Sequence, residues 1–335
     1  MTDKPKVAFY WCASCGGCEE STVDLAEAIL DVAKLVDIVF WPVAIDAKKK
    51  DVEAMADGSI AVSLINGAIR TSEQEEMVRL LRRKSGLVIA YGSCAQSGGI
   101  PALANQFTRE QIMRVVYEEC PTVDNPNKVH PQETYVDTDG IGVTLPGFRN
   151  IVRSLDQVID VDYALPGCPP TPKLLAEALQ AILEGKLPPK GTVLAPDVAQ
   201  CDTCPRKDTK PQDVSYLEFK RPHWTDMDPE KCFLAQGIVC MGPATRSGCE
   251  SQCISGNMPC TGCFGPTSRV RDQGAKIISS ICSSVASEES DQIKSVLSGI
   301  PDPIGTFYRY GLSKCLLRGR VDTAVTTSQS QEARK

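Results

Sequence analysis

The residues most able to do chemistry in this chain are its cysteines, of which there are sixteen in 335 residues. Twelve of them fall into three sets of four, and four thiolates are the usual ligands of one [4Fe–4S] cluster. A single cluster would be enough to brace a fold, so three clusters in one chain indicate electron transfer. The first set is Cys15, Cys18, Cys94 and Cys168; the set called the second here is Cys249, Cys253, Cys260 and Cys263; and the set called the third is Cys201, Cys204, Cys232 and Cys240.

Structural zinc is the main alternative for these spacings. Cys201 and Cys204 form a Cys-x2-Cys hairpin, which on its own is also typical of zinc sites. The set from Cys249 to Cys263 is spaced irregularly for zinc, and the chain has only two histidines. A proline neighbours a cysteine in all three sets, as in ferredoxin loops. These features favour iron–sulfur clusters, while zinc stays open for the hairpin.

Four cysteines are left over. Cys120, Cys282 and Cys315 lie in or near helical patterns, and we expect them to be buried as small apolar side chains. Cys12 differs because it precedes Cys15 by three residues and extends the motif to Cys-x2-Cys-x2-Cys. Two roles stay open for Cys12, namely a cluster ligand or a side chain that supports the ligands.

The bulk composition is typical of a globular protein with room for two domains. The apolar content is 42%, and the net charge of −6 argues against a nucleic-acid surface. No run of about eighteen apolar residues occurs, which argues against a membrane span. The N-terminal residues show no secretory or twin-arginine signal, so this many cysteines favour metal over disulfides. We therefore expect a cytoplasmic protein that binds neither nucleic acid nor membranes.

Apolar strand-like runs alternate with amphipathic helical patterns in the first half, which predicts a parallel sheet wrapped by helices. Helix 19–36 is expected to bury a stripe that includes Val23 and Leu30. The expected strands cover residues 6–11, 37–43, 60–65, 86–91 and 161–165. The expected helices cover residues 19–36, 72–84, 109–120 and 174–183.

The first set of cysteines follows three of these strands. Cys15 and Cys18 come after the first strand, Cys94 after the fourth and Cys168 after the fifth. Parallel strands end at the same edge of a sheet, where open α/β sheets bind their ligands. We therefore expect this set to form one site at that edge.

The pattern changes near residue 195. Prolines punctuate the connection, and cysteine, glycine and proline then dominate until a helical pattern resumes at residues 274–290. Such a loop-rich stretch needs organising bonds, which metal binding supplies. We predict an α/β domain over residues 1–195, a small cluster-binding domain over 196–325 and a disordered tail over 326–335.

The ordered set of motifs resembles the small subunit of [NiFe] hydrogenases over nearly the whole chain. Within that family it is most similar to the cytoplasmic methanogen-type subunits that serve heterodisulfide reductase or coenzyme F420. The motifs are Trp11 with Cys15-Gly-Gly-Cys18 and Glu20-Ser21, Gly-Ser-Cys94-Ala, Gly98-Gly-Ile-Pro101, Gly-Cys168-Pro-Pro, Cys201-Asp-Thr-Cys204-Pro, Cys240-Met-Gly-Pro-Ala-Thr and Pro-Cys260-Thr-Gly-Cys263-Phe-Gly-Pro.

The resemblance implies a flavodoxin-like first domain and three [4Fe–4S] clusters in a row. The set that contains Cys15 would be proximal and face the nickel–iron site of a separate large subunit. The set from Cys249 to Cys263 would be medial, and the set from Cys201 to Cys240 distal. Beyond the distal cluster it implies a downstream redox subunit, either a ferredoxin-like subunit linked to heterodisulfide reductase or a flavin subunit.

Two features depart from the family pattern near the proximal site. Relatives carry an acidic residue where this chain has Asn66, and Cys12 lies on the facing loop. With Glu20, these residues are candidates for a supporting or alternative role at the cluster. These departures leave open an alternative in which the same series of clusters conducts electrons in a hydrogen-independent oxidoreductase complex, whose large subunit has lost the nickel–iron site. A flavin-binding module and a zinc-stabilised scaffold are the alternatives from other classes.

Overall fold

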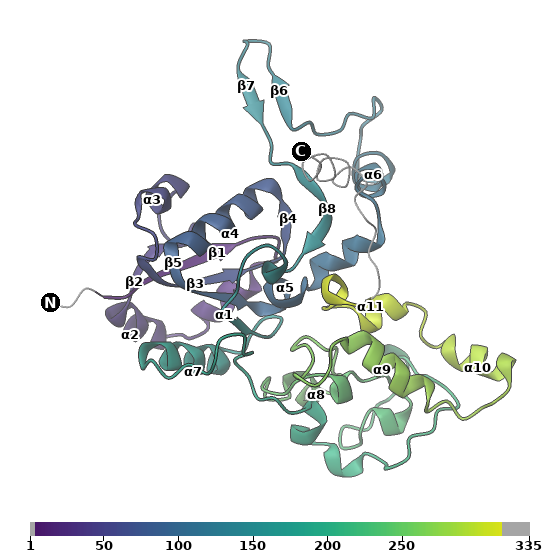
Figure 1. Ribbon diagram of the computed structural model, residues 1–335. Helices are drawn as coiled ribbons and strands as arrows, with labels where there is room; N and C mark the ends of the chain where they lie inside the picture. Colours follow the sequence, from purple (N-terminus) through teal and green to yellow (C-terminus); the bar gives the residue numbers. More distant parts are fainter. Residues whose placement is uncertain (1–3, 317–335) are drawn as a thin grey trace, which may run out of the picture.

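The computed structural model describes residues 4–316, so the tail predicted over residues 326–335 lies outside the described part. The first half forms a five-stranded parallel sheet in the order β2-β1-β3-β5-β9 (Figure 1). This confirms the predicted α/β class and every predicted strand, with small shifts at the ends. The strands are β1 (Lys6–Trp11), β2 (Asp37–Phe40), β3 (Ile60–Asn66), β5 (Ser85–Tyr91) and β9 (Tyr163–Leu165).

Helices cover both faces of the sheet, so its central strands are buried on both sides. Within β3, Ile65 packs in the cluster that contains α4, whereas Leu64 packs in the cluster that contains α7. Side chains alternate across a strand, so both faces of β3 must be apolar. The helices on the α4 side are α3 (Lys49–Ala54) and α4 (Ser72–Lys84), and those on the α7 side are α1 (Gly17–Val23), α2 (Ala28–Leu35) and α7 (Pro172–Leu183).

Three predicted helices are interrupted. The prediction of one helix over residues 19–36 is wrong, because Ala26 adopts a left-handed φ of 52° between α1 and α2. Val23 and Leu30 are exposed instead of buried. Residues 109–120 form α6 (Arg109–Arg114) and then a π-turn (Val115–Glu119), and residues 274–290 contain only α9 (Gln273–Cys282).

Two pairs of short strands have no counterpart in the prediction. β4 (Ile69–Thr71) and β8 (Phe148–Arg153) form an antiparallel ribbon beside the sheet. β6 (Thr134–Val136) and β7 (Gly142–Thr144) form a hairpin that projects from the body (Figure 1). β4, β6 and β7 have only three residues each, and strands that short carry almost no periodic signal.

The second half is rich in loops and turns, as predicted. In the described residues after β9 no further strand of the sheets is found, and a core of aromatic and aliphatic side chains holds short helices together. Its α-helices are α8 (Gln252–Ser255), α9, α10 (Ser290–Leu297) and α11 (Pro303–Phe307); α5 (Gly92–Ser97) belongs to the first half. The predicted boundary between residues 195 and 196 stays a prediction.

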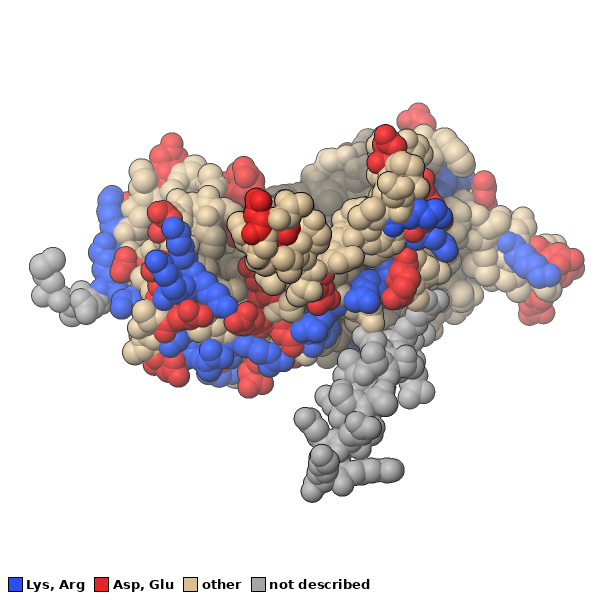
Figure 2. Space-filling model, turned by 90° about the horizontal axis from the view of Figure 1, so that it is seen from above, with Lys and Arg blue, Asp and Glu red and all other residues tan. Residues whose placement is uncertain are grey.

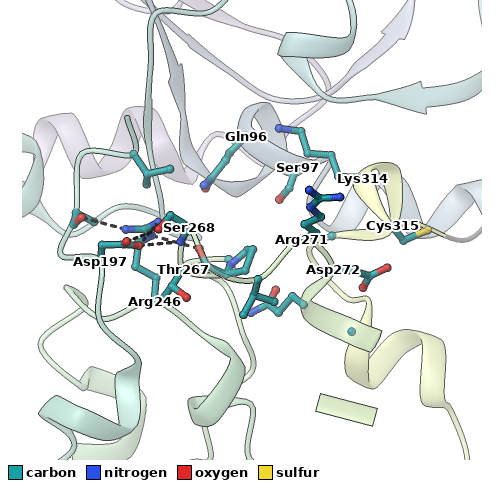
Figure 3. Close-up of a pocket in the computed structure, with 18 of the residues that line it drawn as sticks. Gln96, Ser97, Asp197, Arg246, Thr267, Ser268, Arg271, Asp272, Lys314 and Cys315 are labelled. Carbon is teal, nitrogen blue, oxygen red and sulfur yellow. Dashed lines mark hydrogen bonds and ion pairs between the residues drawn. The ribbon is translucent and has the colours of Figure 1, made fainter. Parts of the chain in front are cut away.

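An ion pair between buried Arg246 and the half-exposed Asp197 links the second half to the connection. Arg246 binds Asp197 at 2.8 Å and also donates to the backbone carbonyls of Ala195 and Pro196. The Ser268 amide donates to the same Asp197 carboxylate at 2.8 Å. These groups lie along a cavity of about 470 Å³ between the two halves, and none of the twelve set cysteines lines it (Figure 3).

The surface charge and the lengths of the helices bear on two of the expected absences, namely binding to nucleic acid and to membranes. On the face shown in Figure 2, Lys and Arg side chains are interspersed with Asp and Glu and form no single patch of positive charge. Among the described residues, no helix is both long and apolar enough to cross a membrane.

Candidate iron–sulfur cluster sites

The first set of cysteines meets at the carboxyl edge of the sheet. Burial, together with negative charge on Cys168 and Cys15, raises the pKa of the Cys94 thiol to about 12. Burial also raises the pKa of Cys18, and the other three thiols add to that shift. Four thiols that repel one another as anions are therefore gathered in one place. Cys18 and Cys94 are buried, whereas Cys15 and Cys168 are exposed, so the site opens to the surface.

Glycines keep space free beside these thiols. Gly92 and Gly99 have positive φ angles of +84° and +56°. A Cβ atom on Gly92 would lie 2.3 Å from Cys18 Sγ, and one on Gly99 would lie 2.5 Å from Cys94 Sγ. Any other residue at either position would collide with a thiol and strain the backbone. The site is thus shaped around its sulfur atoms.

The three other residues singled out near this set have different surroundings. Cys12 is buried in the core on the α4 side of the sheet, apart from the four thiols, and its amide donates to the Asn66 carbonyl at 2.9 Å. Glu20 is exposed. The Asn66 amide donates to buried Glu19 at 3.1 Å, and Trp41 Nε1 donates to the other oxygen of Glu19 at 3.0 Å.

Glu19 is therefore the carboxylate that lies buried beside this site. The family motif contains Glu20 and predicts a role for that residue instead. In the sequence, only the position of Glu19 directly after Cys18 pointed to this residue, and that position does not show that its side chain is buried. The negative charge of Glu19 helps to raise the pKa of Cys18, after burial and the neighbouring thiols.

The second set lines one cavity of about 460 Å³, together with Cys168 of the first set. Burial is the main reason that the pKa of the Cys263 thiol is raised to about 12. The Cys168 backbone amide opposes the rise, and negative charge on Cys168, Cys249 and Cys253 adds to it. The cavity is lined by sulfur from every member of the set, so it has the donors and the room that a cluster needs. The four are Cys249, Cys253, Cys260 and Cys263.

The third set is gathered inside the core of the second half. Burial is the main reason that the pKa of the Cys201 thiol is raised to about 12. Negative charge on Cys240, Cys232 and Cys204 contributes to the rise, and the positive charge of Lys210 opposes it. Cys240 is buried, while Cys204 and Cys232 pack at the edge of the same core. Ligand residues are thus part of the packing of this domain.

The first and second sets touch through a buried serine. The Cys168 backbone amide is near enough to the Cys263 thiol to lower its pKa. Ser93 donates its hydroxyl to the Gly167 carbonyl at 2.9 Å and also contacts the Cys263 carbonyl. Ser93 is next to Cys94 in the chain, so one side chain links both loops of the first set to the second set.

A parallel contact joins the second and third sets. The Met241 amide donates to the Cys260 carbonyl at 2.9 Å, and the Cys260 amide lowers the pKa of the neighbouring Cys240 thiol. Thr245 donates to the Met241 carbonyl at 2.6 Å and hydrogen bonds to the Cys260 thiol. The three sets are therefore arranged in series, with the second in the middle.

Within residues 4–316, no group of three or more His, Cys, Asp or Glu side chains is arranged to hold a single metal ion. Each set supplies four thiols, which is the usual number of ligands of one [4Fe–4S] cluster.

Comparison with known proteins agrees with these sites. The family model described as "NADH ubiquinone oxidoreductase, 20 Kd subunit" matches residues 15–182. The chain is 38% identical to an F420-non-reducing hydrogenase iron-sulfur subunit of Archaeoglobus profundus, over 94% of this chain and 98% of that protein. The chain belongs to the [NiFe] hydrogenase small-subunit family. The resemblance predicted from the motifs is confirmed.

Other relatives place the chain in the same branch of this family. It is 36% identical to the corresponding F420-non-reducing hydrogenase subunit of Methanothermobacter thermautotrophicus, over 95% of this chain and 97% of that one. The oxidised [NiFeSe] hydrogenase of Desulfovibrio vulgaris Hildenborough shares the fold, with a TM-score of 0.50 and 17% identity over 79% of this chain and 95% of that chain. As a family member, the chain is a subunit of an oxidoreductase, as predicted.

Proposed function

We propose that this chain is the electron-transfer small subunit of a cytoplasmic [NiFe] hydrogenase. Its twelve cysteines would hold three [4Fe–4S] clusters: proximal on Cys15, Cys18, Cys94 and Cys168, medial on Cys249, Cys253, Cys260 and Cys263, and distal on Cys201, Cys204, Cys232 and Cys240. When bound, such clusters take up and release single electrons. The observation that supports the proposal is the serial arrangement of three thiol sets, which are linked by Ser93 to the Cys263 carbonyl and by the Met241 amide to the Cys260 carbonyl.

The chain's own residues have three tasks in this function. The thiols would bind iron as thiolates, and at buried positions such as Cys18 and Cys94, where burial raises the thiol pKa, iron would displace the proton. Ser93 and Thr245 hold neighbouring ligand loops in contact, which keeps the path between sites short. The surrounding core excludes water from the buried ligands.

Surface exposure indicates where the partners bind. Cys15 and Cys168 are exposed at the first site, which supports a large subunit with a nickel–iron site that covers this edge. The third set lies at the other end of the series, which supports a downstream redox subunit at that end, either ferredoxin-like or flavin-containing.

Metal analysis of the native complex, isolated without oxygen, tests the proposal. We expect about twelve irons per copy of this chain on the rule of four irons per cluster, with nickel in the partner. Iron without nickel would move the function to a hydrogen-independent complex. Zinc without iron would refute the proposed electron transfer through iron–sulfur clusters. Cys94→Ser should remove only one of three cluster signals in electron paramagnetic resonance (EPR), which identifies the signal of the first site.

A further inference from the structure

Gln200 is a buried polar residue in direct contact with the second cysteine set. It is 1% exposed and lines the cavity of that set. The Cys249 thiol donates to Gln200 Oε1 at 3.3 Å, and Gln200 Nε2 donates to Ser251 Oγ at 2.7 Å. The two ends of one side-chain amide therefore bind a candidate ligand and a serine two residues further along the loop of that ligand.

The backbone on both sides of this contact is held in place. The Gln200 amide donates to the Thr245 carbonyl at 2.7 Å, and the Gln200 carbonyl accepts from the Thr203 hydroxyl at 3.4 Å. Ser251 is buried with a left-handed φ of 56°, a conformation that costs energy for a residue other than glycine and that recurs at functional sites. Gln200 also directly precedes Cys201, so its position is tied to the third set as well.

The direction of these hydrogen bonds depends on the proton of Cys249. In the structure the thiol is the donor, whereas a thiolate that binds iron has no proton and can only accept. Gln200 Oε1 and the sulfur would then be two acceptors facing each other. A half-turn of the amide exchanges its oxygen and nitrogen, so that Nε2 donates to the sulfur. The Ser251 hydroxyl can donate as well as accept, and it then donates to Oε1.

We propose that Gln200 donates a hydrogen bond to the Cys249 sulfur in the iron-bound protein and thereby raises the reduction potential of the second cluster. This inference rests on the proposed function. Hydrogen bonds to the sulfur atoms are among the factors that set cluster potentials. Reduction adds negative charge, and a hydrogen bond to a more negative acceptor is stronger, so the bond favours the reduced form. Gln200 acts only through Cys249, so it is a positioning residue.

Redox titration of the intact complex, followed by EPR, tests this inference. Cys253→Ser identifies the signal of the second site, as Cys94→Ser does for the first. Gln200→Met and Gln200→Leu remove the donor. Gln252→Met is the matched control, because Gln252 lines the same cavity but is exposed. We expect both Gln200 variants to lower the equilibrium constant for reduction of the second cluster about tenfold, which is about 59 mV for a one-electron couple. The control should keep the original midpoint, and so should the first-site signal in every variant.

The possible outcomes separate this inference from the function on which it rests. An unmoved second-site midpoint in a Gln200 variant with full iron content would overturn the role of Gln200 and leave the proposed function intact. An equal shift in Gln252→Met would also overturn it, because the contact with Cys249 would then not be the cause. Absence of the second-site signal in the unmodified complex would instead contradict the proposed function. The two Gln200 variants differ in shape, so one keeps the test available if the other does not assemble.

Discussion

The first cysteine set and the other two are positioned in opposite ways. In the sheet domain, Cys15, Cys94 and Cys168 come from distant parts of the chain and are brought together by the ends of β1, β5 and β9. In the second half, all eight ligand residues lie within residues 201–263 and are held by turns and short helices. The first site lies on a sheet domain that has a hydrophobic core of its own. The ligands of the other two sites are themselves part of the core of the second half.

The difference predicts how each region depends on its metal. The sheet is buried on both faces by aliphatic side chains, and only Cys18 of its ligands belongs to either of the two large clusters that cover it. The core of the second half includes Cys240, with Cys204, Cys232 and Cys260 packed against it. Iron bound to these thiols would therefore contribute directly to the stability of the second domain.

Iron removal should give the largest effect. We expect a chelator under reducing conditions to abolish protection from hydrogen exchange over residues 201–266, while β1, β3 and β5 stay protected because their core contains no metal. Exchange measured by mass spectrometry on the whole chain reports both regions at once. Equal loss of protection in both would show that the sheet depends on its cluster as well.

Gly92→Ala should destroy the first site alone. The added Cβ atom collides with Cys18 Sγ, so we expect loss of about four irons per chain and a backbone strain of about 1 kcal/mol. Gly58→Ala is the matched control, because Gly58 also has a positive φ, +73°, but no atom lies within 4 Å of the added group. Iron analysis of both variants measures the difference. Full iron content in Gly92→Ala would show that the thiol can move aside.

Arg206→Met should loosen the second domain. Buried Arg206 donates to the carbonyls of Asp228, Lys231 and Ile254 and to the Asn257 side chain, at 2.9–3.4 Å. Loss of these bonds leaves buried carbonyls unpaired, so we expect the free energy of local opening to fall by about 3 kcal/mol.

Hydrogen exchange over residues 228–257 measures that change. Arg79→Met is the control, because its exposed pair with Glu75 should contribute less than about 0.5 kcal/mol. Equal effects of the two substitutions would contradict a special role for Arg206.

Asp162→Asn should have a smaller, pH-dependent effect in the sheet domain. Burial would raise the pKa of Asp162, but hydrogen bonds from Lys190, Arg82 and the Val88 amide lower it overall. Because its pKa is lower in the folded state than in the unfolded state, the Asp162 carboxylate stabilises the fold at pH values above its unfolded pKa. This stabilisation is lost as the pH falls through the folded pKa. We expect a cost of about 1 kcal/mol at pH 7 that shrinks below about pH 4. Unfolding measured across this range checks the sign, and a constant cost would contradict it.

Much of the fold and the ligand sets could be predicted from local patterns. The ends of parallel strands share an edge, so strand periodicity alone placed Cys15 near Cys94 and Cys168. Cys120, Cys282 and Cys315 were expected to be buried, but Cys282 is exposed and the other two are only partly buried, because helical periodicity does not tell which face meets the core. The break at Ala26 was missed because a single left-handed residue leaves no periodic signal.

The sequence by itself determined the number, type and grouping of the sulfur donors and the parallel sheet that carries the first set, because both follow from spacing along the chain. Only the tertiary structure decided that Glu19, not Glu20, is buried and that Cys12 lies in the core on the other side of the sheet, apart from the four thiols. Burial depends on contacts between distant segments, and such contacts have no period in the sequence.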